Sequence, residues 1–389
     1  MIRFPEMKKS KQLTIFVTIL AAAVLLSACA GGAATTTSWP GFATDVENMI
    51  VYLSQGTHVY AIDLANPLPS GDEKDPTPKF QQKWRFPIDA SNKTTFYAAP
   101  VLTEDGQLLA ASYDKLLYSL NPETGAQNWA FDGSTNRLLA SPLVSDGMIY
   151  LPSSDYNLYA LDMKGSLAWQ YKADNALWTT PVSDGEIVYQ PSMDHHIYAL
   201  NAKTGKLVWK SDDLDGPIAG SPTLSPEGIL YVATFNSKLV AVDSATGKTL
   251  WEQPLQGWGW SGPYLQDGSL YFGDLKGYIY AKSAADGSDL WQPNQPPAQQ
   301  GQKADLRAIP ERPLLLGDTL YFGSELGTIF AVNPENGIPA PFFTLSGSRL
   351  YTSPQAAGDL ILVAPYGARQ YLLGLDSAGR VVADFVPPK

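Results

Sequence analysis

The sequence predicts an all-β protein made of repeated four-stranded units, and three observations support this prediction. An eleven-residue phrase, Ala-x-(Asp/Asn)-x-x-Thr-Gly-x-x-x-Trp, recurs along the 389-residue chain, most clearly at 199–209 and 241–251. Its closing tryptophans are spaced by 45, 40, 40, 42 and 40 residues. Short stretches of alternating apolar residues, divided by turn signals, lie between these tryptophans. A fixed period near 40 residues indicates a repeat architecture. The closing residues are Trp84, Trp129, Trp169, Trp209, Trp251 and Trp291.

The repeat at 179–209 shows four expected strands in order. The first strand, 179–183, ends at an Asp-Gly turn at 184–185, and the second covers 187–190. A turn at 193–195 leads to the third strand at 197–200, and a Thr-Gly turn at 204–205 leads to the fourth at 207–209. Asp-Gly between alternating apolar segments is a strong hairpin signal. The unit is therefore predicted to be an antiparallel meander.

The other repeats follow the same pattern. First turns with Asp-Gly or Gly-Asp stand at 105–106, 146–147, 267–268 and 317–318. Second strands are expected at 108–111, 149–151, 230–232, 270–272 and 320–322. Third strands are expected at 117–120, 158–161, 239–242, 279–281 and 329–332. No stretch between Trp39 and Val386 has a long helical period.

Four-stranded antiparallel units of this length, stacked radially, form a β-propeller, and we count eight of them in residues 39–389. The first unit covers 39–87, the next five close at the tryptophans from Trp129 to Trp291, and the last two cover 310–343 and 351–386. A seven-bladed ring with an irregular first unit is the alternative. Two polar, proline-rich stretches, 66–80 and 292–305, break the period and are expected to form exposed loops.

Residues 1–28 have the pattern of a secretory signal. Three lysines at 8, 9 and 11 precede an apolar run at 13–26, which is short for a membrane span and ends in small residues. The sequence Leu-Ser-Ala-Cys at 26–29 resembles a bacterial lipobox, in which the chain is cut before the cysteine and the cysteine receives the lipid. We therefore expect lipidation of Cys29, the single cysteine, and a flexible tether at 29–38. A free thiol in an uncleaved signal anchor is the alternative.

The charge of the chain limits its partners. Residues 1–28 carry a net charge of +3 within a total of −11, so the mature chain would have a net charge near −14. This charge argues against nucleic acid or anionic lipid as the main ligand. One cysteine cannot form an internal disulfide. We expect an extracytoplasmic, monomeric propeller that its N-terminal lipid holds on a bacterial membrane, either the cell membrane or the outer membrane.

The phrase at 199–209 resembles the tryptophan-docking repeat of the quinoprotein dehydrogenases, the PQQ-like propeller repeat, and this resemblance covers 39–386. It implies that each closing tryptophan is structural and covers the gap between neighbouring blades. The Thr-Gly turn places a glycine where φ can be positive. Repeat number, length and lipobox together look like the BamB family of outer-membrane assembly lipoproteins. That resemblance implies a non-enzymatic propeller that docks onto the outer-membrane insertase, with no motif here that assigns the docking residues.

Catalysis has little support in the residues. Many quinoprotein dehydrogenases carry an adjacent cysteine pair near the cofactor, which Cys29 alone cannot form. They also use a calcium site, whereas most Asp and Asn residues here fall in turns. His195 and His196 are adjacent and would point to opposite faces of a strand, and no spacing resembles a zinc site. We expect no catalytic residue, cofactor or metal, with a PQQ-dependent dehydrogenase as the alternative.

One set of residues is not explained by the repeat. The residue three positions before each first-strand proline falls on the loop that leads into a blade, and four of these seven residues are aromatic. Tyr, Trp and Arg are typical anchors of binding interfaces. If the ring closes, these aromatics and nearby arginines gather at one mouth of the central channel. The candidate binding surface is Tyr97, Trp178, Trp258, Trp260, Tyr351, Arg137, Arg307 and Arg349.

Two interpretations of this surface remain open. Its residues either pack against neighbouring blades or bind a partner. The sequence as a whole predicts a non-catalytic, membrane-anchored scaffold with a protein partner in the envelope. A carbohydrate- or peptide-binding lipoprotein that uses the aromatic mouth is a further alternative.

Overall fold

The computed structural model describes residues 38–89, 94–296 and 308–388. The chain divides into two compact units, and the description that follows concerns Ser38–Lys389. All regular elements in the described ranges are β-strands. Over those same ranges, no helix is long and apolar enough to cross a membrane.

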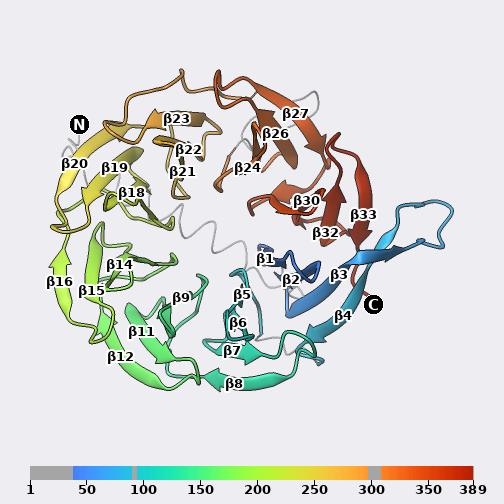
Figure 1. Ribbon diagram of the computed structural model, residues 1–389, viewed down its shortest axis with the longest axis horizontal. Coiled ribbons are helices and arrows are strands. Elements are labelled where there is room, and N and C mark those ends of the chain that lie inside the picture. Colours follow the sequence, from blue (N-terminus) through green and yellow to red (C-terminus); the bar gives the residue numbers. More distant parts are fainter. Residues whose placement is uncertain (1–37, 90–93, 297–307, 389) are drawn as a thin grey trace, which may run out of the picture. The chain divides into compact units, whose positions relative to one another are not determined.

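The strands form eight antiparallel groups arranged around a common centre (Figure 1), as the sequence predicts for a propeller. In each group the first strand lies near the centre and the last lies at the rim. Blade 1 contains β1 (Gly41–Asp45), β2 (Ile50–Gln55), β3 (His58–Leu68) and β4 (Lys79–Phe86). Blade 2 contains β5 (Val101–Leu102), β6 (Leu108–Ala111), β7 (Leu117–Leu120) and β8 (Gln127–Phe131). Blade 3 contains β9 (Leu143–Ser145), β10 (Met148–Pro152), β11 (Asn157–Asp162) and β12 (Leu167–Lys172).

The remaining blades continue around the ring. Blade 4 contains β13 (Val182–Ser183), β14 (Ile187–Pro191), β15 (Ile197–Asn201) and β16 (Leu207–Lys210). Blade 5 contains β17 (Thr223–Leu224), β18 (Ile229–Thr234), β19 (Lys238–Asp243) and β20 (Thr249–Pro254). Blade 6 contains β21 (Tyr264–Gln266), β22 (Ser269–Gly273) and β23 (Ile279–Ser283). Blade 7 contains β24 (Leu314–Leu316), β25 (Thr319–Gly323), β26 (Thr328–Val332) and β27 (Pro339–Thr344).

Blade 8 contains β29 (Gln355–Ala357), β30 (Leu360–Val363), β32 (Leu372–Leu375) and β33 (Val381–Phe385). A separate antiparallel pair is formed by β28 (Arg349–Leu350), which precedes this blade in the sequence, and β31 (Pro365–Tyr366), which lies between β30 and β32. Blades 8 and 1 join edge to edge where β33 pairs in parallel with β4, at Asp384 and Lys79. The Lys79 Nζ lies 2.8 Å from the Asp384 Oδ1, so an ion pair reinforces this junction.

The recurring phrase acquires a structural meaning from the strand register. In blade 4, Ala199 on β15 lies opposite Trp209 on β16, and the register then shifts by one residue. In blade 5, Ala241 and Trp251 pair in the same way before the same shift. The alanine leaves room for the indole on its face of the sheet, because directly opposed side chains are close neighbours. The spacing from Ala to Trp is thus the spacing of one hairpin with one bulge.

Blade 6 differs from the prediction because its fourth strand is reduced to two isolated bridges. These bridges join Lys282 to Asp289 and Ile279 to Asn294. Prolines begin at Pro293, and a proline lacks the backbone N–H that a continuous ladder needs. The stretch 66–80 also differs from a simple loop, because β3 continues to Leu68 and the hairpin projects from the ring (Figure 1).

The hydrophobic core is a ring of layers between blades. Tyr52 and Ala61 of blade 1 pack with Leu108 and Ala110 of blade 2, and similar clusters follow at the other junctions. The last cluster joins blade 1 to blade 8 and includes Phe385. Each blade therefore buries its apolar faces only against its neighbours.

Candidate functional site

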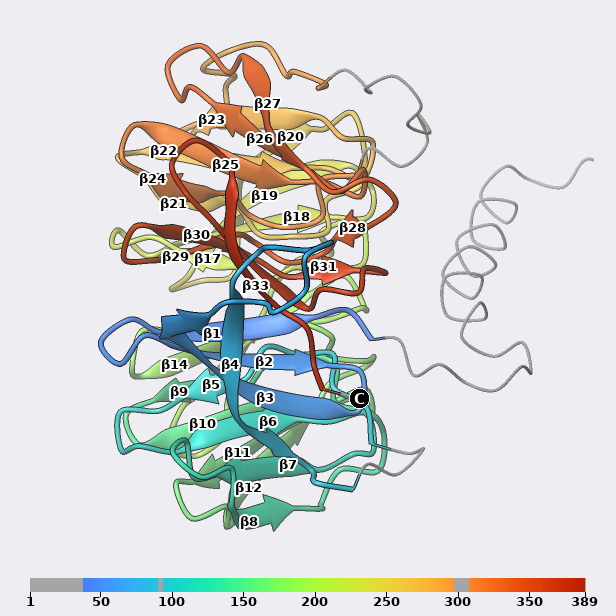
Figure 2. The ribbon, with the colours of Figure 1, turned by 90° about the vertical axis from the view of Figure 1, so that its right-hand side faces the viewer.

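The two faces of the ring differ in which connections they carry. Loops that follow second and fourth strands lie on one face, here called the mouth face, because neighbouring strands are antiparallel. The Asp-Gly turns and the Thr-Gly turns lie on the other, here called the turn face. Figure 2 views the ring edge-on, with one face on each side. The predicted binding-surface residues that the structure describes belong to the mouth face.

Three of those residues surround Trp39, which the sequence prediction did not include. The Trp39 ring centroid lies 5.8 Å from Tyr97, 5.9 Å from Trp260 and 5.7 Å from Tyr351. These three residues, here called the aromatic cage, come from the loops before β5 and β21 and from the residue after β28. Segments of blades 2, 6 and 8 thus converge on one indole. The protein fills this part of the mouth with its own side chain.

The segment around Trp39 is fixed on both sides. The Ser38 Oγ accepts a 2.6 Å hydrogen bond from the backbone N–H of Gly56, in the turn between β2 and β3. Pro40 is buried, and its ring restricts the backbone there. Gly41 approaches the next blade so closely that a Cβ would lie 2.5 Å from the backbone nitrogen of Ala99. Trp39 is therefore held where blade 1 begins.

Two predicted arginines lie beside the cage. The Arg137 guanidinium carbon stands 4.3 Å from the centre of the Tyr113 ring, which is itself 5.2 Å from Tyr97. This is cation–π geometry. The Arg349 Nη1 donates a 2.9 Å hydrogen bond to the Tyr351 hydroxyl. Burial raises the pKa of Tyr351 to about 12, and the hydrogen bond from Arg349 partly opposes this rise.

The other predicted residues divide into three cases. Trp258 stacks on Phe235 at 5.8 Å, and Phe235 also stacks on Trp260 at 5.5 Å. Trp178 stands apart from the cage in blade 4, and its Nε1 is buried with no hydrogen-bond partner among the described residues. Arg307 lies outside the described residues. The sequence could have indicated Trp39 through its position, because Trp39 precedes the first strand of blade 1 just as the cage residues precede the first strands of their own blades.

The wall of the channel is built from small residues, a pattern that the sequence prediction missed. The Ser141 Oγ donates to the Ala99 carbonyl at 2.8 Å, and the Thr180 Oγ1 donates to the Ser141 carbonyl at 2.9 Å. A Cβ on Gly262 would overlap the carbonyl oxygen of Ser221. Inner segments of neighbouring blades therefore touch. The two positions before the first-strand proline are Ala, Ser, Thr or Gly at 98–99, 140–141, 179–180, 220–221, 261–262 and 352–353.

Blade 7 breaks this rule with Glu311 and Arg312. Both side chains are partly exposed to solvent, but most of their surroundings are protein atoms. Burial raises the pKa of Glu311 to about 7, and the charge of Arg312 opposes this rise. Burial also lowers the pKa of Arg312. The Arg312 Nη2 lies over Gly262 of blade 6, 3.6 Å from where a Cβ would stand.

The closing tryptophans lie against the next blade. A Cβ on Gly205, in the Thr-Gly turn of blade 4, would stand 2.5 Å from the Trp169 ring of blade 3. The Trp169 Nε1 donates a 2.9 Å hydrogen bond to the Ala202 carbonyl in the same turn. The remaining closing tryptophans meet the corresponding glycines, at 125, 165, 247, 287 and 337. This geometry supports the structural interpretation of these tryptophans.

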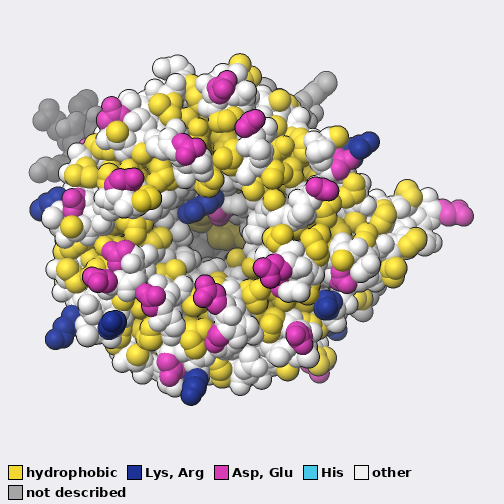
Figure 3. Space-filling model, in the orientation of Figure 1, with side chains coloured by type: hydrophobic (Ala, Val, Ile, Leu, Met, Phe, Trp, Pro, Cys, Tyr) yellow, Lys and Arg dark blue, Asp and Glu magenta, His cyan; other side chains and the backbone are white. Residues whose placement is uncertain are grey.

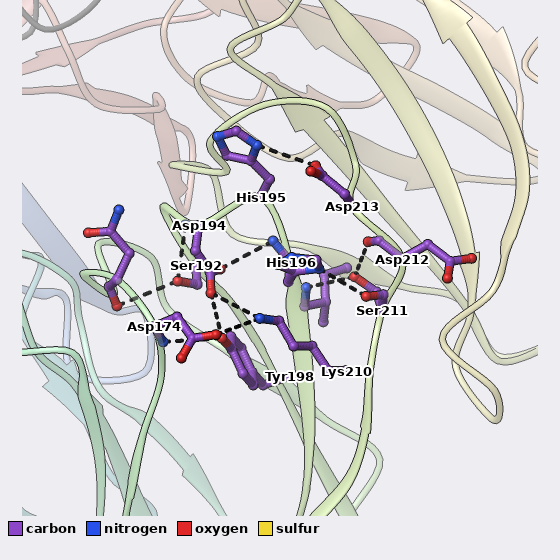
Figure 4. A network of polar contacts seen from close by, with 12 residues as sticks. Asp174, Ser192, Asp194, His195, His196, Tyr198, Lys210, Ser211, Asp212 and Asp213 are labelled. Atoms are coloured by element: carbon purple, nitrogen blue, oxygen red, sulfur yellow. Dashed lines mark hydrogen bonds and ion pairs between the residues drawn. The ribbon is translucent and has the colours of Figure 1, made fainter. Parts of the chain in front are cut away.

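The histidines belong to a polar network on the mouth face of blade 4 (Figure 4). The His195 Nδ1 lies 3.3 Å from the Asp213 Oδ1, and the His196 Nδ1 lies 2.9 Å from the Ser211 carbonyl oxygen. The Lys210 Nζ binds the Asp174 Oδ2 at 2.7 Å. The two histidines thus engage separate partners. Within the described ranges, no group of three or more His, Cys, Asp or Glu residues could hold a metal ion.

The surface view shows how charge is distributed over one face. Figure 3 shows a central hollow with acidic side chains spread around the ring, among apolar and uncharged groups. The net charge of −11 agrees with this distribution. An acidic surface of this kind repels polyanions at moderate salt.

Comparison with known proteins places this architecture in a family. A family model described as "Outer membrane protein assembly factor BamB" matches residues 81–192 and 193–339. The BamB of Yersinia pestis is 26% identical over 334 residues, which cover 79% of this chain and 80% of that protein. The crystal structure of BamB from Moraxella catarrhalis superposes with a TM-score of 0.63 and 18% identity, covering 89% of this chain and 98% of that one.

A quinoprotein is also similar. The dehydrogenase subunit of the quinone-dependent alcohol dehydrogenase of Gluconacetobacter polyoxogenes is 29% identical over 178 residues. That stretch covers 41% of this chain and 24% of the enzyme, so the similarity concerns part of the repeat array. The BamB family model, by contrast, covers well over half of the chain. The protein therefore belongs to the BamB family of outer membrane protein assembly factors.

Proposed function

We propose that this protein is a non-catalytic, lipid-anchored propeller that presents protein-binding surfaces during the assembly of outer-membrane proteins. The observation that carries the proposal is the BamB family match across residues 81–339, together with the Yersinia pestis relative over 79% of the chain. Lipidation at Cys29, which lies outside the described residues, would hold the protein at a membrane outside the cytoplasm. The proposed partner is the insertase machinery with which this family works.

The packing at the mouth of the channel favours a scaffold function over the entry of a ligand through that mouth. Trp39 fills the space between Tyr97, Trp260 and Tyr351, so a ligand entering there would first have to displace a residue of the chain itself. A carbohydrate or peptide site at the cage would require the same displacement. The surfaces left for a protein partner are then the outer loops of both faces and the rim.

A PQQ-dependent dehydrogenase is the second candidate, favoured by the alcohol dehydrogenase relative. The chain contains one cysteine, so it lacks the adjacent cysteine pair that many quinoprotein enzymes carry. A melting experiment with added PQQ and calcium separates the two candidates. A scaffold shows no shift of the melting temperature, whereas a cofactor-binding enzyme is stabilised in proportion to ligand occupancy.

The test of the proposed function is purification of a tagged protein from detergent-solubilised envelopes. We expect the outer-membrane insertase to copurify with the wild-type protein. The Cys29→Ala variant should leave the membrane fraction and lose this partner at native levels. Recovery of the wild-type protein in the membrane fraction without any insertase component would contradict the assembly role.

A further inference from the structure

Arg312 is a charged residue at a position that faces the central channel. The position directly before the first-strand proline, here called the wall position, leads into the innermost strand of each blade (Figure 1), so its exposed side faces the channel. Figure 3 shows a basic side chain at the edge of the central hollow. Arg312 is partly exposed at the wall position of blade 7. Other partly exposed residues at wall positions are small, namely Ala99, Ser141, Thr180, Ser221 and Ser353.

The Arg312 guanidinium lies along this wall without a partner. Its Nη2 stands 3.6 Å from where a Cβ of Gly262 would lie, and Gly262, at the wall position of blade 6, is buried. Among the described residues the guanidinium forms no hydrogen bond and no ion pair, although it feels the charge of Glu311. A guanidinium has five N–H donors, and donors that are shielded from water without an acceptor are costly. The channel therefore contains a set of unmatched donors.

Hydroxyl groups beside Arg312 are unmatched as well. The Ser261 Oγ of blade 6 is buried and has no partner among the described residues. The matching hydroxyl of blade 4, on Thr179, donates to the Ser221 Oγ of blade 5 at 3.1 Å. In blade 7 Arg312 occupies the position that Ser221 has in blade 5, so Ser261 lacks this acceptor. The Ser353 hydroxyl, at the wall position of blade 8, is partly exposed and bonds to no group of the described chain.

We propose that Arg312 anchors a site in the central channel for the carboxylate group of a small organic monoanion, with the Ser353 hydroxyl as a second donor. The fork of a guanidinium matches the two oxygens of a carboxylate. One guanidinium balances a single negative charge, whereas a phosphate dianion requires a second cation. The net charge of −11 on the chain further disfavours a multiply charged ligand.

The ligand would approach this site from the turn face. At the mouth face, Trp39 fills the space between Tyr97, Trp260 and Tyr351. The small residues at the other wall positions leave the channel free in front of Arg312. This inference does not rest on the lipidation of Cys29 or on the assembly role, so its failure leaves the proposed function standing.

The test is ligand-detected NMR on the full-length chain in detergent, with sodium acetate as the probe and sodium chloride holding the ionic strength constant. Burial raises the pKa of Glu311 to about 7, so at pH 6 its carboxyl is mostly neutral and repels acetate little. We expect saturable transfer of magnetisation from the wild-type protein to the acetate methyl group. Arg312→Gln should reduce this transfer at least about fivefold, because the charge and the fork are both lost.

Two further arginine variants separate the site from general attraction of anions. Arg369→Gln removes an exposed arginine in the loop between β31 and β32, and should leave the transfer unchanged. Arg312→Lys keeps the charge but not the fork, and should retain less than about half of the transfer. A melting curve shows whether each variant is folded.

Ser353→Ala provides a test that leaves the arginine in place. It should weaken acetate binding about two- to threefold through the loss of one hydrogen bond. If Arg312→Gln does not fold, unchanged binding by Ser353→Ala overturns the site. Absence of saturable transfer in the wild-type protein also overturns it, as does full transfer in a folded Arg312→Gln protein. If inorganic phosphate displaces acetate at a lower concentration than formate does, the assignment to a carboxylate is wrong.

Discussion

Gly205 shows how one residue joins two blades. Its φ of 68° lies in the left-handed region, and a Cβ there would stand 2.5 Å from the Trp169 ring. Gly106 has a φ of 78° but no atom near the place of a Cβ. Substitution of Gly106 therefore tests backbone strain alone, whereas substitution of Gly205 tests the same strain together with the contact with Trp169.

This pair gives the first prediction. Gly106→Ala should lower the free energy of unfolding by about 1 kcal/mol, the cost of a left-handed alanine. Gly205→Ala should cost about 1–3 kcal/mol more, because the methyl group displaces the Trp169 indole. Urea denaturation of the two variants measures the difference. Equal losses of the free energy of unfolding in the two variants would show that the Trp169 indole moves aside at no cost and that its contact with the turn does not stabilise the junction between blades.

Glu311 gives a prediction about pH. Its folded-state pKa of about 7 lies above the usual 4.5, so the protonated carboxyl favours the folded state. That stabilisation is complete below about pH 4.5 and is lost as the pH rises through about 7. Glu311→Gln should therefore gain stability relative to wild type by about 1–2 kcal/mol between pH 5 and pH 8, after allowance for solvent in the channel.

Urea midpoints at the two pH values check the Glu311 prediction. Glu104→Gln, at an exposed position, serves as the control and should show the same difference from wild type at both pH values. A Glu311→Gln effect that is independent of pH would mean that the channel hydrates this carboxyl as well as bulk water does.

Among the elements, the fourth segment of blade 6 has the fewest ladder pairs of any blade in the described array. Two isolated bridges replace the ladder that β20 forms with β19 in blade 5. The backbone amides of Asp289, Trp291 and Gln292 should exchange hydrogen at least about tenfold faster than those of β20, because the Leu290 amide is the one in this stretch that bonds to the neighbouring strand, at the Ala281 carbonyl. Hydrogen exchange followed by mass spectrometry measures both segments in one sample. Equal protection would show that side-chain packing alone holds this edge.

For the whole molecule, the junction of β4 and β33 closes the ring. Asp384 is 2% exposed, and the Lys79 Nζ lies 2.8 Å from its Oδ1. Lys79→Met should lower the free energy of unfolding by about 2–3 kcal/mol, because it leaves a buried carboxylate without its counter-charge. Lys74→Met, at an exposed position nearby, should cost less than about 0.5 kcal/mol.

A double variant completes the test of the ring closure. Lys79→Met combined with Asp384→Asn should recover much of the loss, because the buried charge is then absent. Chemical denaturation of the single and double variants provides the comparison. Additive losses would contradict the pairing and place the cost in packing alone.

The repeat could be predicted from the sequence because the strands and turns of each blade are determined by residues that are close together in the chain. The strands expected at 108–111 and 117–120 coincide with β6 and β7, since alternation and turn residues act over a few positions. The fourth strand of blade 6 failed because prolines override the pattern there. Trp39 was not predictable from alternation, because its ring neighbours lie 58, 221 and 312 residues away. Only ring closure brings them together.

The position of the closing contact has a consequence for biosynthesis. β33 follows every other strand of the described ring in the sequence, so its contact with β4 can form only after the rest of the ring has been synthesised. Until then, the apolar face of blade 1 that packs against blade 8, including Tyr60 and Phe80, is uncovered, and an exposed apolar face favours aggregation. A nascent chain stalled before Val381 would expose part of that face for as long as the stall lasts. The last strand of the described ring thus decides how long each new molecule is vulnerable.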